Sequence, residues 1–379
     1  MIRLSAILET FETELLSQFG HTLLPSQRQA LAAMKRCRTA HSPCFEVHCS
    51  DCDHTQYLPH SCGHRSCPHC QHHQGQQWLD AQRQKHVPAE YFLLTFTLPA
   101  ELRDLAWHQP RSVYDAMLRC SWQTVRQFTE NDPQLQGQPG AIAVLHTHSR
   151  RLDYHPHVHL VMPAAAVDVE HRLWRTKGGK KAKRKNAAGF LFPQRALATV
   201  FRAKLLDALH REELPLPPHY PQQWVVHCQS VGSGEQALVY LGRYLYKGVL
   251  QEKDILACNN GQVTFRYQDG KTRQWQTRTL PGVAFLRLLL QHVLPKGLRR
   301  ARNFGFLHPN SKRLIALLQW LLERRTLQPD RSPTALRTCG RARSFSNGHG
   351  SAGCSASVCL VVRFGPWSWP CFSRPVHSA

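Results

Sequence analysis

The chain has 379 residues, 42% of them hydrophobic, so it is long enough for two or three domains with sizeable cores. Its 48 lysine and arginine residues outnumber 25 aspartate and glutamate residues, which gives a formal net charge of +23. This excess predicts a polyanionic partner, with nucleic acid favoured over an acidic membrane surface, because basic side chains displace counterions from phosphates. The chain shows neither a run of 18 apolar residues nor a signal-peptide core, so we expect a cytoplasmic protein with no membrane span.

The first 43 residues predict a helical segment, because apolar residues such as Ile7, Phe11 and Leu15 recur at roughly helical spacing. Residues 44–75 form a second segment, rich in cysteine and histidine and poor in apolar side chains. A segment of this kind in a cytoplasmic protein cannot hold a core without a metal, so we expect a small zinc-binding module.

Two Cys-x-x-Cys pairs in this module are separated by 14 residues, one short of the commonest spacing of structural zinc sites. Each pair presents two thiolates to one tetrahedral ion, and two pairs complete a closed shell around a structural Zn²⁺. Cys44 and Cys62 are spare thiols, and neighbouring histidines could replace a cysteine ligand. The expected ligands are Cys49, Cys52, Cys67 and Cys70.

Residues 88–325 predict an α+β domain in which compact apolar runs alternate with amphipathic stretches. We expect an antiparallel sheet with helices on one face and the strand of residues 157–162 at its centre. The expected strands are 91–98, 141–145, 157–162, 224–228, 263–267 and 275–280, and the expected helices are 111–130, 194–212, 235–248 and 283–325.

The triplet His157-Val158-His159 lies in one of these strands. Alternate side chains of a strand share a face, so both imidazoles can bind one cation while Val158 packs on the other side. By itself the pattern is weak, because the chain has 24 histidines and a solvated pair would look the same.

The helix predicted for residues 235–248 contains Tyr240, Tyr244 and Lys247. The two tyrosines are four residues apart, so their hydroxyls project from one helix face, and Lys247 follows on nearly the same side. A tyrosine oxygen can attack a phosphodiester and form a covalent phosphotyrosine, whereas an ordinary amphipathic helix remains the alternative.

Two basic segments are expected to contact the DNA backbone. The first is a glycine-containing loop within residues 175–186, which holds seven basic residues and no acidic one, and the second is a basic cluster that begins at residue 296. The predicted DNA-binding residues are Lys180, Lys181, Lys183, Arg184, Lys185, Lys296, Arg299 and Arg300.

The last 49 residues, 331–379, contain no Asp, Glu, Lys, Ile or Gln. This abrupt change predicts a disordered segment, or one translated outside the ancestral reading frame.

Taken together, these segments resemble the HUH endonuclease superfamily. Residues 93–98 (LLTFTL), 157–159 (HVH) and 244–247 (YLYK) are similar, in the same order, to its three motifs. Tyr240 and the cysteine module extend the resemblance to the two-tyrosine rolling-circle transposases of IS91-type insertion sequences, with their N-terminal zinc-binding domain. The resemblance covers about residues 20–310 and includes the strings HPHVHLVMP, FLFPQRALATVFR, YLGRY and HVLPKGLRRARNFGF.

The resemblance implies a DNA transposase that cleaves and rejoins single-stranded or hairpin element ends through a 5′-phosphotyrosine. It implies Tyr244 as first nucleophile, Tyr240 as second and Lys247 as a stabilising charge. It also implies a catalytic Mg²⁺ or Mn²⁺ held by His157, His159 and a third ligand, for which His146 is preferred slightly over His148. Relatives often continue with a further Cys-x-x-Cys pair, whereas the tail of this chain has only isolated cysteines.

Two other functions share much of this pattern. A plasmid replication initiator or relaxase would use the same chemistry, and a zinc-containing DNA-binding protein from a decayed element would use none. The zinc module and the paired tyrosines favour the transposase. The target sequence and the oligomeric state are beyond the reach of the sequence.

Overall fold

The computed structural model describes residues 2–52, 54–68, 70, 72–171, 173–177, 189–246, 249–270, 272–322 and 362–363. The chain divides into two compact units, one of residues 1–35 and 63–329 and the other of residues 36–62 and 330–379. None of the helices in the described part of the chain has the length and apolar character that a membrane span requires.

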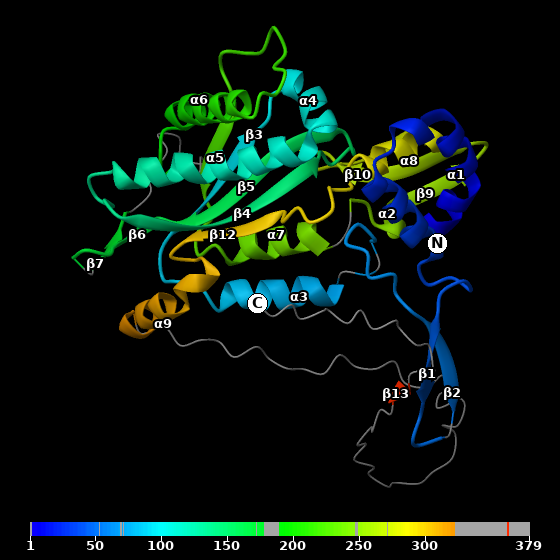
Figure 1. Cartoon of the computed structure of the whole chain (residues 1–379). Coiled ribbons are helices and arrows are strands. Elements are labelled where there is room, and N and C mark those ends of the chain that lie inside the picture. Colours follow the sequence, from blue (N-terminus) through cyan, green and yellow to red (C-terminus); the bar gives the residue numbers. More distant parts are fainter. Residues whose placement is uncertain are drawn as a thin grey trace, which may run out of the picture. The chain divides into compact units, whose positions relative to one another are not determined.

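A large antiparallel sheet forms the centre of the first unit (Figure 1). Its strands follow the order β7-β6-β4-β5-β3-β8, and β12 pairs with β4 outside this path. The histidine-bearing strand β5 therefore lies between β4 and β3. The strands are β3 (Tyr91–Thr97), β4 (Gln138–His148), β5 (Tyr154–Pro163), β6 (Ala165–Asp168), β7 (Leu173–Thr176), β8 (Val226–Ser230) and β12 (Ala301–Gly305).

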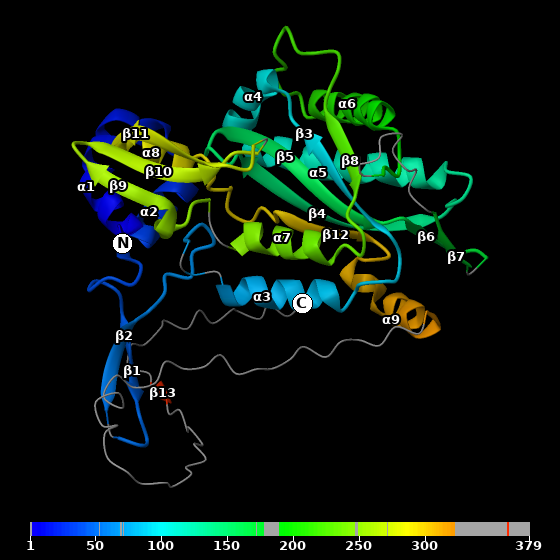
Figure 2. The ribbon, with the colours of Figure 1, turned by 180° about the vertical axis from the view of Figure 1, so that it is seen from behind.

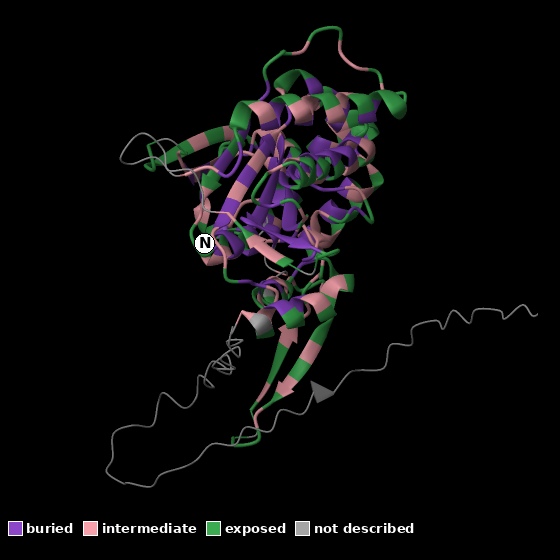
Figure 3. Ribbon diagram, turned by 90° about the vertical axis from the view of Figure 1, so that its left-hand side faces the viewer, coloured by how far each residue is buried: buried purple, intermediate pink, exposed green. Residues whose placement is uncertain are grey.

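Helices cover both faces of this sheet (Figures 1 and 2). On one face α5 (Pro110–Glu130) and α6 (Gln194–Arg211) pack on a core that includes Ala143 and Leu145 of β4. On the other face α7 (Glu235–Tyr246) packs on Val144 of the same strand, because successive side chains of a strand alternate between faces. Figure 3 shows buried residues concentrated between these layers. The adjoining helices are α3 (His72–Arg83), which contacts α7, and α4 (Arg103–His108) and α9 (Lys312–Leu321).

A smaller sheet in the same unit has the order β11-β10-β9 and carries α8 (Gly282–Leu290). The N-terminal helices α1 (Leu4–Phe19) and α2 (Pro25–Arg36) belong with it. The ring of Phe11 in α1 lies so close to Gly282 that an added Cβ would meet it at 2.4 Å, and the Gln27 side chain donates to the Leu290 carbonyl at 3.0 Å. The strands are β9 (Ile255–Asn259), β10 (Gln262–Gln268) and β11 (Trp275–Pro281).

In the second unit, β1 (Cys44–His48) and β2 (Thr55–Pro59) form an antiparallel hairpin. The short strand β13 (Val362–Arg363) pairs with β1. The remainder of the predicted disordered or frame-shifted tail lies outside the described residues.

The α+β class and the antiparallel sheet predicted from the sequence are confirmed. The expectation of helices on one face is wrong, because α7 packs on the face opposite to α5 and α6. The helix predicted for residues 283–325 is wrong in its middle, because residues 301–305 form β12. In this strand Arg302 and Phe304 face α5, and their neighbours face the other way. The sequence therefore has the two-residue alternation of a strand, but the inward-facing positions include an arginine and the pattern was not recognised as apolar. Strand β9 was also absent from the sequence prediction.

Candidate functional site

Three histidines from two adjacent strands meet on the α7 face of the large sheet. His146 of β4 lies opposite His157 of β5, and His159 follows two residues later on the same side. One nitrogen from each ring lies within 4.8 Å of the others, and all three residues are at least nine-tenths buried. The structure thus brings together the two histidines of the HVH triplet and the preferred third ligand.

Neighbouring groups fix the orientation of these rings. The Thr95 hydroxyl of β3 forms a hydrogen bond with Nδ1 of His159 at 3.0 Å. Nδ1 of His157 donates to the His155 carbonyl oxygen at 2.6 Å, so Nε2 of that ring is the nitrogen with a lone pair to offer. Arg103 donates to Nδ1 of His155 at 2.8 Å and so holds the next ring along the strand. Such outer contacts commonly orient metal-binding histidines.

Burial keeps the three imidazoles neutral. It lowers the pKa of His157 to about 4 and that of His159 to about 3, with a smaller contribution from neighbouring histidines. The pKa of His146 also falls well below its usual value, first through burial and then through repulsion by His159 and His157. Neutral imidazole is the form that binds metals, and three such ligands leave coordination positions open for a substrate oxygen. The donor set therefore fits a divalent cation.

Helix α7 brings Tyr240 to the histidines. Its ring centroid lies 6.1 Å from that of His146 and 5.9 Å from that of His159. The residue is 45% exposed, so the phenol borders both the histidine site and solvent. Partial burial raises the pKa of Tyr240, and the nearby charge of Arg150 opposes this rise. The backbone of Tyr244 continues the same helix, whereas its side chain and Lys247 lie outside the described residues.

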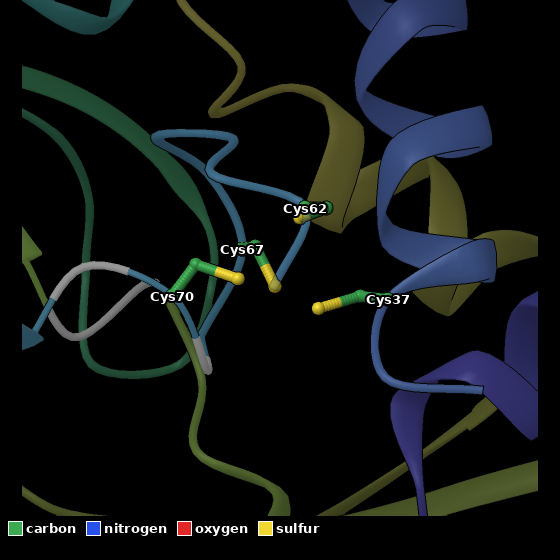
Figure 4. Close-up of side chains that lie close together, drawn as sticks. All are labelled: Cys37, Cys62, Cys67 and Cys70. Carbon is green, nitrogen blue, oxygen red and sulfur yellow. The ribbon is translucent and has the colours of Figure 1, made fainter. Parts of the chain in front are cut away.

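A second group of side chains that could hold a metal ion consists of four cysteines (Figure 4). The sulfur atoms of Cys37, Cys62, Cys67 and Cys70 all lie within 4.8 Å of one another. Four thiolates are the complete shell of a structural zinc ion. Two of the expected ligands, Cys67 and Cys70, are in this group. The other two, Cys49 and Cys52, are outside it and lie at the turn of the β1–β2 hairpin.

Comparisons with known proteins match two stretches of the chain to transposase families. A family described as "Transposase zinc-binding domain" matches residues 7–98, and one described as "Putative transposase" matches residues 140–314. The chain is 30% identical over 311 residues to "Putative transposase y4qJ" of Sinorhizobium fredii, and the match covers 76% of each chain.

The chain belongs to the IS91-type transposase family. It is also 30% identical over 265 residues to "Transposase for insertion sequence element IS801" of Pseudomonas savastanoi pv. phaseolicola, a match that covers 68% of this chain and 63% of that one. No solved structure matches the chain. The zinc-binding domain of this IS91-type transposase and its four-cysteine group together support a structural zinc ion.

The predicted basic residues of this transposase lie in different places. Arg300 is close enough to His146 and His148 for its charge to lower the pKa of both histidines. Lys296 and Arg299 are exposed, and Arg299 lines a groove beside α5. Five predicted residues, namely Lys180, Lys181, Lys183, Arg184 and Lys185, lie outside the described residues.

Sequence reasoning missed several side chains around the histidines. Thr95 was in a predicted strand, and its partner His159 could be found only from the strand register. Arg150 is the second residue after strand β4, so the polar loop SRRLDYHP already placed a positive charge close in sequence to His148. Its charge acts on the Tyr240 phenol. The guanidinium of Arg65, within the predicted zinc-binding module, donates to the carbonyls of Leu294 and Leu298, both at 2.8 Å.

Proposed function

We propose that this IS91-type transposase cuts and rejoins single-stranded or hairpin DNA at the ends of its element through a 5′-phosphotyrosine, in a rolling-circle-like route. The observation that supports this most directly is the position of Tyr240 beside His146 and His159. The family membership supplies the substrate class, since a transposase acts on DNA. The excess of basic residues agrees with it.

In the proposed reaction the phenolic oxygen attacks the scissile phosphorus. A P–O bond to tyrosine forms, the bond to the 3′-oxygen breaks, and the leaving oxygen takes up a proton while the phenol loses one. The number of phosphodiester bonds is conserved, so attack by a 3′-hydroxyl can reverse the step and join a new strand without a nucleotide cofactor.

We propose that His146, His157 and His159 hold a divalent cation, Mg²⁺ or Mn²⁺, which would polarise the scissile phosphate when bound. Imidazole ligands suit Mn²⁺ better, whereas cellular abundance favours Mg²⁺. Around this site, Thr95 and the His155 carbonyl orient the rings, and Arg150 offers a positive charge near the phenol.

Two tyrosines on one helix would permit two successive cleavages. The described geometry supports Tyr240 as a nucleophile, while Tyr244 as first nucleophile and Lys247 as its helper remain predictions from the sequence. We propose that the catalytic domain comprises residues 88–325, preceded by an N-terminal helical segment, residues 1–43, and a zinc-binding module, residues 44–75. We further propose that the protein acts in the cytoplasm.

A strand-cleavage assay tests the proposal. Labelled single-stranded oligonucleotides that tile both element ends are incubated with the full chain and Mn²⁺, and denaturing gels reveal cleaved and protein-linked DNA. We expect His157→Ala to abolish cleavage and Tyr240→Phe to abolish the cuts that depend on that phenol. Exposed His210→Ala and half-buried Tyr220→Phe are the matched controls and should behave as the parent does.

A parent protein that forms no covalent adduct on any element-end oligonucleotide would contradict the proposal. The remaining function would then be that of a zinc-containing DNA-binding protein. Cleavage that survives in the Tyr240→Phe Tyr244→Phe double variant would equally contradict the tyrosine chemistry.

A further inference from the structure

A basic groove runs beside α5, on the face of the large sheet that is turned away from the three histidines. Its cavity is about 560 Å³, and its walls come from α5, the residues before β12, and β12 itself. Arg302 and Phe304 pair with Ala143 and Ala141 of β4, which belong to the core under α5 and α6. His146 is an odd number of residues away from both alanines, so it faces the opposite side of the sheet.

The groove gathers positive charge. Its lining includes Arg111, Arg119, Arg126, Arg299 and Arg302 but only one acidic residue, Asp115. Arg302 forms an ion pair with Asp115, which neutralises that carboxylate. Arg119 contacts Glu212 at 3.2 Å and Arg126 contacts Glu130 at 2.7 Å, but these pairs are partly exposed to solvent, which weakens their hold on the guanidiniums.

The arginines of α5 form a stripe along the helix. Positions 111, 119 and 126 are separated by eight and seven residues, so they lie close to one face. At 1.5 Å per residue the stripe is about 22 Å long, enough for several consecutive phosphates of one strand.

Aromatic side chains lie in the middle of this stripe. The rings of Trp122 and Phe304 stack with centroids 5.1 Å apart and an interplanar angle of 8°, and both residues are half-buried within the lining of the groove. A basic track with accessible aromatic rings is how proteins hold single strands without reading their sequence, since phosphates meet cations while bases stack.

We infer that the α5 groove binds a single DNA strand as a second DNA site, separate from the histidine site on the opposite face. The inference takes from the proposed function only that the partner is DNA. A strand held there would keep the element or its flanking DNA attached while another segment occupies the histidine site.

Equilibrium binding tests this inference without any cleavage. A fluorescein-labelled single strand is titrated with the full chain in the Tyr240→Phe Tyr244→Phe background, with no Mn²⁺ added, and anisotropy is measured over a range of salt concentrations. The test variant is Arg119→Ala Arg299→Ala. The matched control is Arg195→Ala Arg313→Ala, which removes two exposed arginines outside the groove.

Each phosphate contact contributes about 0.7 to the slope of log K against log salt for a single strand. We therefore expect the test variant to reduce the slope by about 1.4 and to weaken binding about 25-fold at about 0.1 M salt. The control should match its background protein. Equal melting temperatures verify folding, and Gln123→Glu, which adds an acid to the groove and removes no arginine, should also weaken binding.

An unchanged slope and affinity in Arg119→Ala Arg299→Ala would overturn the inference. So would a loss seen only with duplex DNA, because the groove would then not be a single-strand site. Failure of the proposed function is recognised separately, since it would appear as an absent covalent adduct in the parent whatever the groove variants bind.

Discussion

Replacement of Thr95 by valine is the sharpest single perturbation of the metal site. The two side chains have nearly the same shape, so Thr95→Val removes the hydroxyl that contacts Nδ1 of His159 at 3.0 Å and little else. The ring of His159 would lose the contact that fixes its orientation, although its position on β5 would not change.

The size of the effect follows from two independent estimates. Loss of a contact that orients a metal-binding histidine typically lowers metal affinity about 10- to 100-fold. Leaving a buried polar nitrogen without its partner costs about 1–3 kcal/mol, and every ~1.4 kcal/mol corresponds to a factor of ten. The ranges agree, so we expect Mn²⁺ to bind Thr95→Val about 10- to 100-fold more weakly than the parent.

Isothermal titration of the full chain with Mn²⁺ measures this difference. Thr97→Val is the matched control, because Thr97 lies on the same face of β3 opposite His157. The Nδ1 of His157 already donates to the His155 carbonyl, so Thr97→Val should bind Mn²⁺ as the parent does. Parental affinity in Thr95→Val, or an equal loss in both variants, would refute the reasoning that Thr95 positions His159.

Three further predictions concern the scaffold. Burial lowers the pKa of His292 to about 4, so the unfolded chain takes up a proton near pH 6.5 that the folded chain resists, and stability falls as pH drops through this window. Denaturant titrations should show a loss approaching ~3 kcal/mol from this residue near pH 4, and His292→Gln should flatten the pH dependence. Zinc analysis should find that Cys62→Ser loses bound zinc while Cys49→Ser retains it, because only Cys62 is in the four-cysteine group; equal retention by both would contradict that ligand set. Gly305 has φ +58° and an added Cβ would lie 1.7 Å from the Pro139 carbonyl oxygen, so Gly305→Ala should lower the free energy of unfolding by more than ~2 kcal/mol, whereas Gly270→Ala, with open space around it, should not.

The periodicity of a strand was enough to predict that His157 and His159 share a face, because that property is local. The same periodicity places His146 and His148 on one face, and it could not choose between them as third ligand. The strand register separates the two residues through a shift between His146 and His148. It leaves His146 opposite His157 and His148 opposite Tyr154.

The four-cysteine group is an arrangement that local spacing does not predict. The two Cys-x-x-Cys pairs suggested a common ion, yet Cys37, which precedes the expected module, is the residue that joins Cys62, Cys67 and Cys70. Which cysteines come together depends on contacts between segments that are distant in sequence, and the spacing of a Cys-x-x-Cys pair does not encode these contacts. The α5 groove could not be predicted for the same reason. Its walls are distant in sequence, and one of them, β12, was predicted as helix.

The most direct test of the central claim is to identify the residue that becomes linked to DNA. The full chain is incubated with a cleavable element-end oligonucleotide and Mn²⁺, digested, and analysed by mass spectrometry for peptides that carry a 5′-phosphonucleotide. The account predicts a modified peptide from α7 with the phosphate on Tyr240 or Tyr244, and none in His157→Ala. A phosphonucleotide attached to any residue outside α7, or an adduct that forms equally well without His157, would contradict it.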